Sequence, residues 1–600
     1  MHRGNILKVM FLALIVGGGI FVRTFHLDHP PLRIDEAESA INALTILQHG
    51  YPSNTYVGEP IFENTLTRPW PGHPEFEFRD TSYSDKGMAV YHGWLPLYAM
   101  AGAFRLAGVV PDNVRAMGAP VVIPRDENEM RRRTAVARAP SVLFAILFML
   151  TIYRAGSRML GSDAGAIGLV IAAFAEPCVR VARQARYYSA TLAIGALACL
   201  LIWEIRRRGR WRDFIGGAVV LAMLFHTHLL TFVVAVAWAL ITCWPIYTAP
   251  ANLRKISVSL AILVSAIVPW IVLTGFPGPA ASIPPARNLM RFPDDLISYL
   301  RDQPLFAGLL VAGAVAGVLA IFCGRLPKRK EHDSPTSAQR AADAWRIAAI
   351  PASALWLWVI LAIAAFYLLS PASSAFLWRL TLSLQGPAIL LAAMLLAGLA
   401  RAIAPRYLAW VAPLLVIVFI LRPAPLLQHL RPPPRKGAEP LYEAIDFLRT
   451  QPLRASTKIY ALPFQHLPLM FYTGLPVQSI APVRKTFLDQ YPGDILLVDP
   501  APRVQAIRHP DDNGLWQNPA IFRGYECYDR ADFWPMFFYR FVDPARRSGE
   551  HLNYASRMAT ATRTVLVSGW TVYYSPGPFR PAGSSLRKPA AAGHGLTVGN

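Results

Sequence analysis

Continuous apolar runs are the feature that most constrains the fold of this chain. They recur along most of its 600 residues, and as helices they are long enough to cross the ~30 Å hydrocarbon layer of a bilayer. The composition agrees, since 54% of the residues are hydrophobic and only 16% are charged, whereas a soluble domain carries about 25% charged residues. The sequence therefore predicts a polytopic α-helical membrane protein.

The first apolar run, residues 6–22, is interpreted as a retained membrane anchor, because no small-x-small cleavage site precedes the charged cluster that follows it. Several of the later runs are short for a span, so about eleven to thirteen spans are expected. The run at 89–110 cannot be a simple span if the first run leads out of the cytoplasm and the run at 136–153 leads back in. The later runs lie at 89–110, 136–153, 163–177, 187–204, 214–226, 229–247, 256–274, 304–322, 347–369, 379–400 and 406–421.

The net charge of +22 is distributed in short clusters between the apolar runs, as expected from the positive-inside rule and not from a nucleic-acid surface. With these clusters inside, residues 178–186, 275–303, 370–378 and everything after 421 lie outside. The five cysteines stand alone and predict neither a zinc site nor a disulfide framework. The clusters lie at 154–158, 204–212, 254–255, 324–330 and 401–406.

Two polar regions interrupt the apolar pattern. Residues 25–88 form a long first exoplasmic loop, and 422–440 are a proline-rich linker between a membrane module, 1–421, and a soluble domain, 441–600. Alternating strand and helix patterns predict a small exoplasmic α/β domain. It has no phosphate loop and no catalytic triad, so a docking or capping role is favoured. The patterns are a helix at 441–450, a strand at 458–463, a helix at 466–474 and a strand at 494–500.

The first loop opens with an acidic cluster, "IDEAESAINALTIL", residues 34–47. If this stretch is helical, Asp35, Glu38 and Ser39 share one face and apolar side chains lie on another. The face could hold an acid at the membrane boundary and present it to a polar headgroup. An acid-rich first turn that suits the helix dipole explains the cluster equally well.

Four places along the chain together resemble one family. The Asp-Glu pair after the first span, "VYHGWLPLYAM" (90–100), "PCVRVARQARYYSATL" (177–192) and "WRLTLSLQGPAILLAAMLLAGLA" (378–400) are similar, in this order, to elements of the GT-C membrane glycosyltransferases. The likeness is to the superfamily of protein O-mannosyltransferases (dolichyl-phosphate-mannose-protein mannosyltransferase-like) and aminoarabinose transferases. It covers residues 1–421 and implies a GT-C-like fold.

The resemblance implies transfer of a sugar from a polyprenyl-phosphate carrier to an envelope acceptor, with Asp35 and neighbouring Glu36 as general base or metal-organising acid. Such a reaction needs a base for the acceptor and a cation for the departing phosphate. Arginine suits phosphate because its planar fork binds two oxygens. The candidate substrate-binding residues are Arg379, Arg186, Arg183, His92, Tyr187 and Glu38.

Other roles stay open for these residues. The arginines could contact lipid headgroups, Tyr187 and Tyr188 could belong to an aromatic belt, and His92 could be structural. A divalent cation is the one cofactor left open, with Glu36, Glu176 and His228 as candidate ligands. The second exoplasmic loop is basic, and Glu176 is the only acid near it, so metal dependence is in doubt.

Two other functions compete with sugar transfer: a flippase or transporter of polyprenyl-linked sugar, and a non-catalytic scaffold for envelope assembly. Transporters tend to show internal repeats, and no convincing repeat is seen here. The expected partners are the donor lipid, the bilayer and a glycan, lipid or protein acceptor, and nucleic acid is not expected. The Ala- and Arg-rich composition favours a bacterial inner membrane, with the active site and the C-terminal domain facing the periplasm.

The expected topology can be tested by cysteine labelling. A cysteine introduced by Asn553→Cys should react with a membrane-impermeant reagent added to spheroplasts, because the last outward run, 406–421, leaves the chain outside. If residue 553 is protected until the membrane is lysed, the topology is overturned and the proposed site lies on the wrong side.

Overall fold

The structure is a computed structural model. It describes residues 3–61, 83–112 apart from 85, 91 and 92, residue 123, 126–276, 337–369 and 377–403, together with isolated residues from 297–318 and short segments after 440. The chain divides into two units, Met1–Asp112 with Asp126–Pro434, and Asn113–Arg125 with Arg435–Asn600. The division at Pro434 falls inside the expected linker, whereas residues 113–125 were not expected to belong with the second unit.

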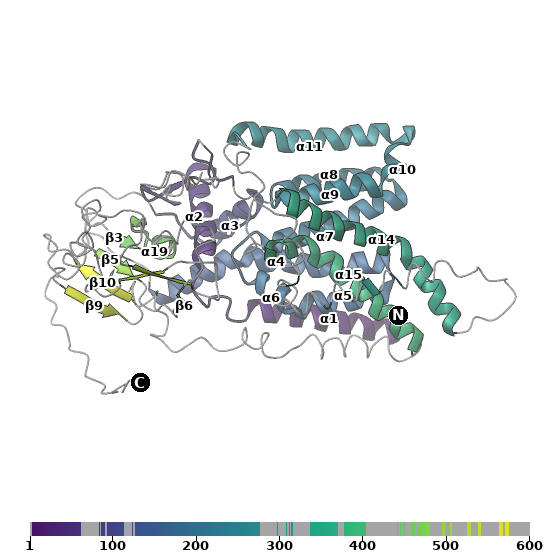
Figure 1. Ribbon diagram of the computed structural model, residues 1–600, viewed down its shortest axis with the longest axis horizontal. Helices are drawn as coiled ribbons and strands as arrows, with labels where there is room; N and C mark the ends of the chain where they lie inside the picture. Colours follow the sequence, from purple (N-terminus) through teal and green to yellow (C-terminus); the bar gives the residue numbers. More distant parts are fainter. Residues whose placement is uncertain are drawn as a thin grey trace. The chain divides into compact units, whose positions relative to one another are not determined.

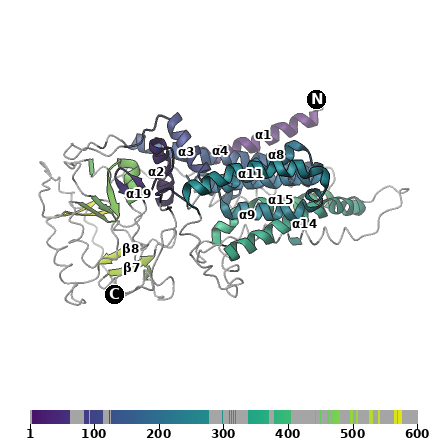
Figure 2. The ribbon, with the colours of Figure 1, turned by 90° about the horizontal axis from the view of Figure 1, so that it is seen from above.

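In the residues that the structure describes, the first unit is helical apart from a two-stranded ribbon, β1 with β2. Its long helices run side by side, and α2 crosses them at one end (Figures 1 and 2). The elements are α1 (Arg3–Thr24), α2 (Ile34–His49), β1 (Thr55–Tyr56), β2 (Glu59–Pro60), α3 (Leu95–Leu106), α4 (Glu127–Met159), α5 (Ser162–Phe174), α6 (Glu176–Ala182), α7 (Tyr188–Arg208), α8 (Trp211–Phe225), α9 (Leu229–Thr242), α10 (Trp244–Tyr247), the short η2 (Pro250–Asn252), α11 (Leu253–Thr274), α14 (Ser337–Leu369) and α15 (Leu377–Ile403).

The apolar runs that lie in the described part of the chain are confirmed as helices. Within the described ranges, three stretches are long and apolar enough to cross a membrane, namely α4, α7 and Pro250–Thr274, and the bent pair α5 with α6 would make a fourth. Shorter apolar helices occur in α1, α9, α14 and α15. The runs at 304–322 and 406–421 lie largely outside the described residues, so the number of spans stays a prediction.

The run at 89–110, which conflicted with simple alternation, contains the 12-residue helix α3. At 1.5 Å per residue this helix is roughly 18 Å long, too short to cross the bilayer alone. It packs against α2 and α4. With α3 outside the set of spans, the chain can leave the membrane after α1 and return through α4.

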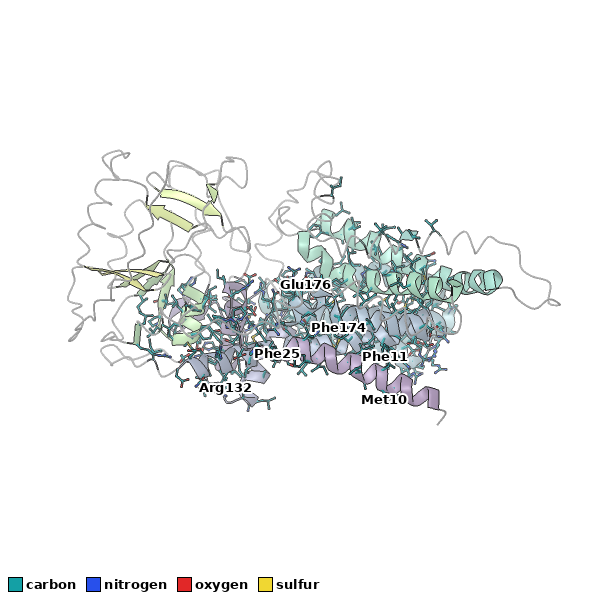
Figure 3. The ribbon with its side chains drawn as sticks, turned by 90° about the horizontal axis from the view of Figure 1, so that it is seen from below. Met10, Phe11, Phe25, Arg132, Phe174 and Glu176 are labelled. Carbon is teal, nitrogen blue, oxygen red and sulfur yellow. The ribbon has the colours of Figure 1, made fainter. Side chains whose placement is uncertain are left out.

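The two ends of the bundle have different chemistry. We call the end with α2 the loop end: it carries residues 22–36, 178–187, 226–229 and 272–276. The opposite end, which we call the basic end, carries the arginines in the last turns of α4 and α7, where Arg207 donates to the main-chain oxygen of Arg158. Figure 3 shows Phe25 and Glu176 nearer the loop end, and Met10 and Phe11 further along α1 toward the basic end.

Close packing of small residues joins α4 to α5. A Cβ atom built on Gly156 would lie 2.8 Å from the Cα of Gly165, and one on Gly165 would lie 2.6 Å from the main-chain oxygen of Tyr153. Small residues of this kind let two membrane helices approach backbone to backbone. α5 then contacts α15, which also packs against α7 and α14.

The described segments of the second unit include two sheets. The larger has the strand order β4-β3-β5-β10-β9, in which β3 (Ile459–Ala461) is parallel to β4 (Val477–Ser479) and to β5 (Ile495–Val498). Helix α19 (His466–Thr473) connects β3 to β4 and stops at Gly474, whose φ is +66°. These elements match the expected strands at 458–463 and 494–500 and the helix at 466–474, whereas 441–450 lies largely outside the described residues.

The remaining strands of the second unit are antiparallel. In the larger sheet β10 pairs with both β5 and β9, so the sheet is mixed. A separate three-stranded sheet has the order β6-β7-β8. These strands are β6 (Gln505–Ala506), β7 (Tyr525–Asp529), β8 (Phe538–Phe541), β9 (Arg563–Val567) and β10 (Trp570–Tyr574).

A glycine substitution tests the α4–α5 contact. Gly165→Ala should lower the thermal midpoint of the detergent-solubilised protein, because overpacking a tight contact costs about 1–3 kcal/mol. Gly17→Ala in α1 is the control, since nothing lies within 4 Å of its added Cβ. Equal midpoints for the two variants, measured by fluorescence-detected size exclusion after heating, would contradict the close approach.

Candidate active site

Helix α2 carries the acidic cluster across the loop end. Arg33, whose backbone is extended, is the N-cap of the helix. The Glu36 carboxylate turns back to accept the N–H of Arg33 at 3.1 Å, as in a capping box. The helix ends at Gly50, whose φ is +80° and whose N–H bonds to the oxygen of Ile46.

Glu36 is buried and held by an arginine from another helix. Arg138 of α4 donates from Nε and Nη2 to its two carboxylate oxygens, both at 2.9 Å, and the N–H of Ala185 donates to it at 2.8 Å. Burial alone would raise the pKa of Glu36, but the charge and hydrogen bonds of Arg138 outweigh it and lower this pKa. Glu36 is therefore an ionised anchor between α2, α4 and the α6–α7 loop.

Arg138 also binds the chain between α1 and α2. Its Nη1 donates to the main-chain oxygens of Leu27 at 3.0 Å and Pro30 at 2.8 Å. These carbonyls lie outside regular structure and would otherwise lose a partner when water is excluded. One guanidinium therefore fixes both the start of α2 and its approach.

A second arginine holds the opposite face of the first turn of α2. Arg186 donates from Nη1 to the main-chain oxygen of Asp35 at 2.7 Å, to Glu38 Oε2 at 3.2 Å and to Ser39 Oγ at 2.9 Å. These three residues are the ones predicted to share a helix face, which is confirmed. The guanidinium also lies 5.8 Å and 5.9 Å from the ring centroids of Tyr187 and Tyr188.

The three acids of the cluster differ in exposure. The side chain of Asp35 is 33% exposed, with Oδ2 at 3.8 Å from Arg186 Nη2, whereas that of Glu38 is 7% exposed and that of Glu36 is 4% exposed. A carboxylate must be reachable to take a proton from a substrate. Of these acids, Asp35 best combines access with a nearby positive charge.

Arg183 and Arg23 lie where helices end. Arg183 donates to four main-chain oxygens at the end of α1, with distances from 2.6 to 3.3 Å. Arg23 in turn donates to Ala173 at 2.6 Å and Ala172 at 2.7 Å near the end of α5. The last carbonyls of a helix have no partner within it, so both guanidinium groups serve as helix caps.

Tyr187, which lies beside Arg186, contacts His228. Tyr187 is buried, and its ring stacks on that of His228 with centroids 5.4 Å apart and an angle of 18°. His228 precedes α9, so the contact joins the α6–α7 loop to the turn before α9. The neighbouring His226 instead bonds the main-chain oxygen of Ala266 in α11.

The other predicted site residues are placed less closely. Arg379 lies in the first turn of α15, and its side chain is outside the described part; His92 is outside the described residues altogether. Glu176 begins α6 and pairs with Arg180 at 3.3 Å. Within the described residues, no group of three or more His, Cys, Asp or Glu side chains could hold a metal ion.

Sequence reasoning did not single out Arg138 or Arg23. Both carry a detectable signal, because each is an arginine inside or at the edge of an apolar run, where a charge is expensive and usually has a partner. The close approach at Gly93 was also missed. A Cβ there would lie 1.9 Å from the main-chain carbon of His226, so the backbone at Gly93 packs directly on the turn before α9.

Comparisons with known proteins extend this description. No family model matches the chain, and no curated protein matches it by sequence. Among solved structures it is similar to ArnT from Cupriavidus metallidurans bound to undecaprenyl phosphate, with a TM-score of 0.53 and 11% identity over 96% of this chain and 99% of that one. This likeness shows the fold of the chain.

Two further solved structures are similar at lower scores. The oligosaccharyltransferase of Archaeoglobus fulgidus has a TM-score of 0.46 and 9% identity, covering 88% of this chain and 73% of that chain. The arabinofuranosyltransferase AftD from Mycobacteria has a TM-score of 0.47 and 13% identity, covering 94% of this chain and 41% of that chain.

The Glu36–Arg138 pair gives a stability prediction. Glu36→Gln should destabilise the protein by about 3–5 kcal/mol, because it leaves a buried guanidinium without its counter-charge. Glu127→Gln is the control, since Glu127 is 31% exposed, its pairing with Arg131 is long at 3.6 Å, and such pairs contribute under about 1 kcal/mol. Thermal midpoints in detergent measure both changes.

The sign of the pH dependence follows from the lowered pKa of Glu36. Its contribution is present above the ordinary value of 4.5 and is lost as the pH falls below 4.5 through the lower pKa of the folded state. The wild type should lose this part of its stability over that window and Glu36→Gln should not. Parallel pH profiles for the two proteins would contradict the assignment.

Proposed function

Since the chain has the GT-C fold of membrane glycosyltransferases, we propose that it transfers a sugar from a polyprenyl-phosphate carrier to an acceptor at the loop end of the bundle. The observation that carries this proposal is Asp35: a partly exposed carboxylate on a helix that two buried arginines, Arg138 and Arg186, fix from either side. ArnT, the fold neighbour with the highest TM-score given above, was crystallised with undecaprenyl phosphate, which supports a carrier of this class.

In the proposed reaction Asp35 is the general base. The acceptor hydroxyl gives its proton to the Asp35 carboxylate while its oxygen forms a bond to the anomeric carbon of the sugar. The bond from that carbon to the phosphate oxygen breaks, and the polyprenyl phosphate leaves with the electron pair. Arg186, whose Nη2 lies 3.8 Å from Asp35 Oδ2, orients the carboxylate.

Glu36 and Glu38 have supporting roles in this proposal. Glu36 accepts three hydrogen-bond contacts from Arg138 and Ala185, and Glu38 is paired with Arg186, so both position α2. Arg183 is committed to the carbonyls of α1 and acts as a cap. Tyr187 is a buried contact of Arg186 and His228, and we do not assign it a stacking contact with the sugar.

The carrier phosphate is assigned to the first turn of α15. Arg379 lies there, and an arginine fork can bind two phosphate oxygens as negative charge develops. His92 stays a second candidate for substrate contact. The three candidate metal ligands do not form a set: Glu36 is bound to Arg138, Glu176 to Arg180 and His228 to Thr231. No step is therefore assigned to a cation.

The location follows from the same proposal. The loop end and residues 441–600 are placed on the periplasmic face of a bacterial inner membrane, because Arg158 in the last turn of α4 and the three arginines in the last turn of α7 lie at the opposite end. The domain after the linker, with its βαβ unit, is proposed as an α/β docking module for the acceptor. The competing flippase has no specific observation in its favour, and it is an outcome of the test below.

The test compares two aspartates of similar exposure. Asp35→Asn should reduce sugar transfer from a radiolabelled polyprenyl-phosphate sugar by ~10²- to 10⁴-fold, which is the usual contribution of positioned proton transfer. Asp28→Asn is the control, because Asp28 lies on the connection just before α2, is 30% exposed and contacts Arg131 at 3.6 Å. It should retain near wild-type activity.

Both variants should insert and elute as the wild type does. Wild-type transfer by Asp35→Asn would show that the cluster is an ordinary helix start. If the wild type moves lipid-linked sugar across vesicles without reacting it, the chain is a flippase and the transferase proposal fails.

A further inference from the structure

Ser383 of α15 is a junction of three helices. Its hydroxyl lies 2.6 Å from Thr231 Oγ1 of α9, and its main-chain oxygen accepts the indole N–H of Trp358 of α14 at 2.8 Å. All three side chains are buried, with exposed fractions of 3% for Ser383, 1% for Thr231 and 1% for Trp358. Polar contacts at this depth are specific, because few partners compete for them.

Pro387 explains why the main-chain oxygen of Ser383 can accept a hydrogen bond from Trp358. In an α-helix the oxygen of residue 383 would accept the N–H of residue 387, but Pro387 has none. A carbonyl left without its helical donor in an apolar interior costs free energy unless another group bonds it. Trp358 supplies that bond. The proline thus converts one turn of α15 into a docking point for α14.

From Thr231 the contacts continue to the loop end. Thr231 Oγ1 lies 2.7 Å from His228 Nδ1, and the His228 ring stacks on Tyr187. Tyr187 in turn lies beside the guanidinium of Arg186, which holds the first turn of α2 and Asp35. An unbroken series of contacts therefore joins Ser383 to Asp35. We call the four residues Tyr187, His228, Thr231 and Ser383 the coupling chain.

Ser383, at the other end of the coupling chain, lies next to the turn of α15 that we assign to the carrier phosphate. Arg379 precedes Ser383 by four residues, so the two lie on the same face of α15, one turn apart. That separation is roughly 6 Å along the helix. Whatever fixes Ser383 also fixes the turn that carries Arg379.

We propose that the coupling chain is a positioning element, which sets the first turn of α15, and with it the carrier phosphate, relative to Asp35. This inference rests on the proposed function and adds residues that act through Arg379 and Asp35 without touching the reacting atoms. Loss of a link leaves each group present but allows the phosphate-binding turn to shift. Misplacement of about 1 Å is enough to cost a large factor in rate.

The experiment replaces Thr231 and measures the donor side separately from the acceptor side. Thr231→Val keeps the shape but removes the hydroxyl between His228 and Ser383. We expect about tenfold weaker binding of polyprenyl phosphate and about tenfold higher KM for the sugar donor, with the acceptor KM unchanged; a tenfold change corresponds to about 1.4 kcal/mol. Thr231→Ser, which retains the hydroxyl, should restore both.

Two further variants complete the experiment, one as a control and one as a second test of the same contact. Thr227→Val is the control, because the Thr227 hydroxyl donates to the main-chain oxygen of Met223 in the last turn of α8, at 2.7 Å, and not to the coupling chain. His228→Phe keeps an aromatic ring for Tyr187 but loses the bond to Thr231, and it replaces Thr231→Val if the latter does not fold. It should reproduce the donor-side defect.

The outcomes separate the two proposals. If the wild type binds the lipid phosphate and transfers sugar, while Thr231→Val and His228→Phe match it, the positioning role is wrong and the proposed function stands. If the variants raise both KM values equally and lower the thermal midpoint, the chain is merely structural. A wild type that neither binds the lipid phosphate nor transfers sugar would overturn the proposed function and the positioning role together.

Discussion

The loop end depends on arginine side chains that satisfy main-chain carbonyls where the chain leaves the membrane. Helix ends and irregular connections expose oxygens that hydrocarbon cannot bond, and here Arg183, Arg23 and Arg138 bond those of α1, α5 and the α1–α2 connection. Each guanidinium joins segments far apart in sequence. These bonds attach the first loop to α4, α5 and the α6–α7 loop, and they hold α2 in a fixed position.

Because α2 is fixed in this position, its neighbouring acids have different roles. Glu36 faces the interior, where a buried bidentate arginine keeps it charged, and Glu38 faces Arg186. Asp35, on the same face as Glu38, retains access. A chemically uniform cluster thus separates into two anchors and one reachable carboxylate, and this separation is the physical basis for proposing Asp35 as the base.

The sequence predicted much of this arrangement because membrane helices carry strong local signals. Apolar length located α4, α7 and α15, and the spacing of Asp35, Glu38 and Ser39 gave the face that Arg186 contacts. What it did not predict depends on contacts between distant segments: the partner of Glu36, the capping role of Arg183 and the packing of Gly93 on His226. Pro387 was visible in the sequence, but its consequence for the Ser383 carbonyl appears only when Trp358 lies beside it. The assignment of Asp35 as the base stays a prediction.

The central claim is that the loop end carries out sugar transfer, and the most direct measurement is the fate of the label. Purified wild-type protein in vesicles would be given a radiolabelled polyprenyl-phosphate sugar together with an envelope extract as acceptor. The account predicts that label leaves the lipid and appears on the acceptor, with free polyprenyl phosphate released in equal amount. Label that crosses the vesicle membrane or stays in place while still attached to its lipid would contradict it.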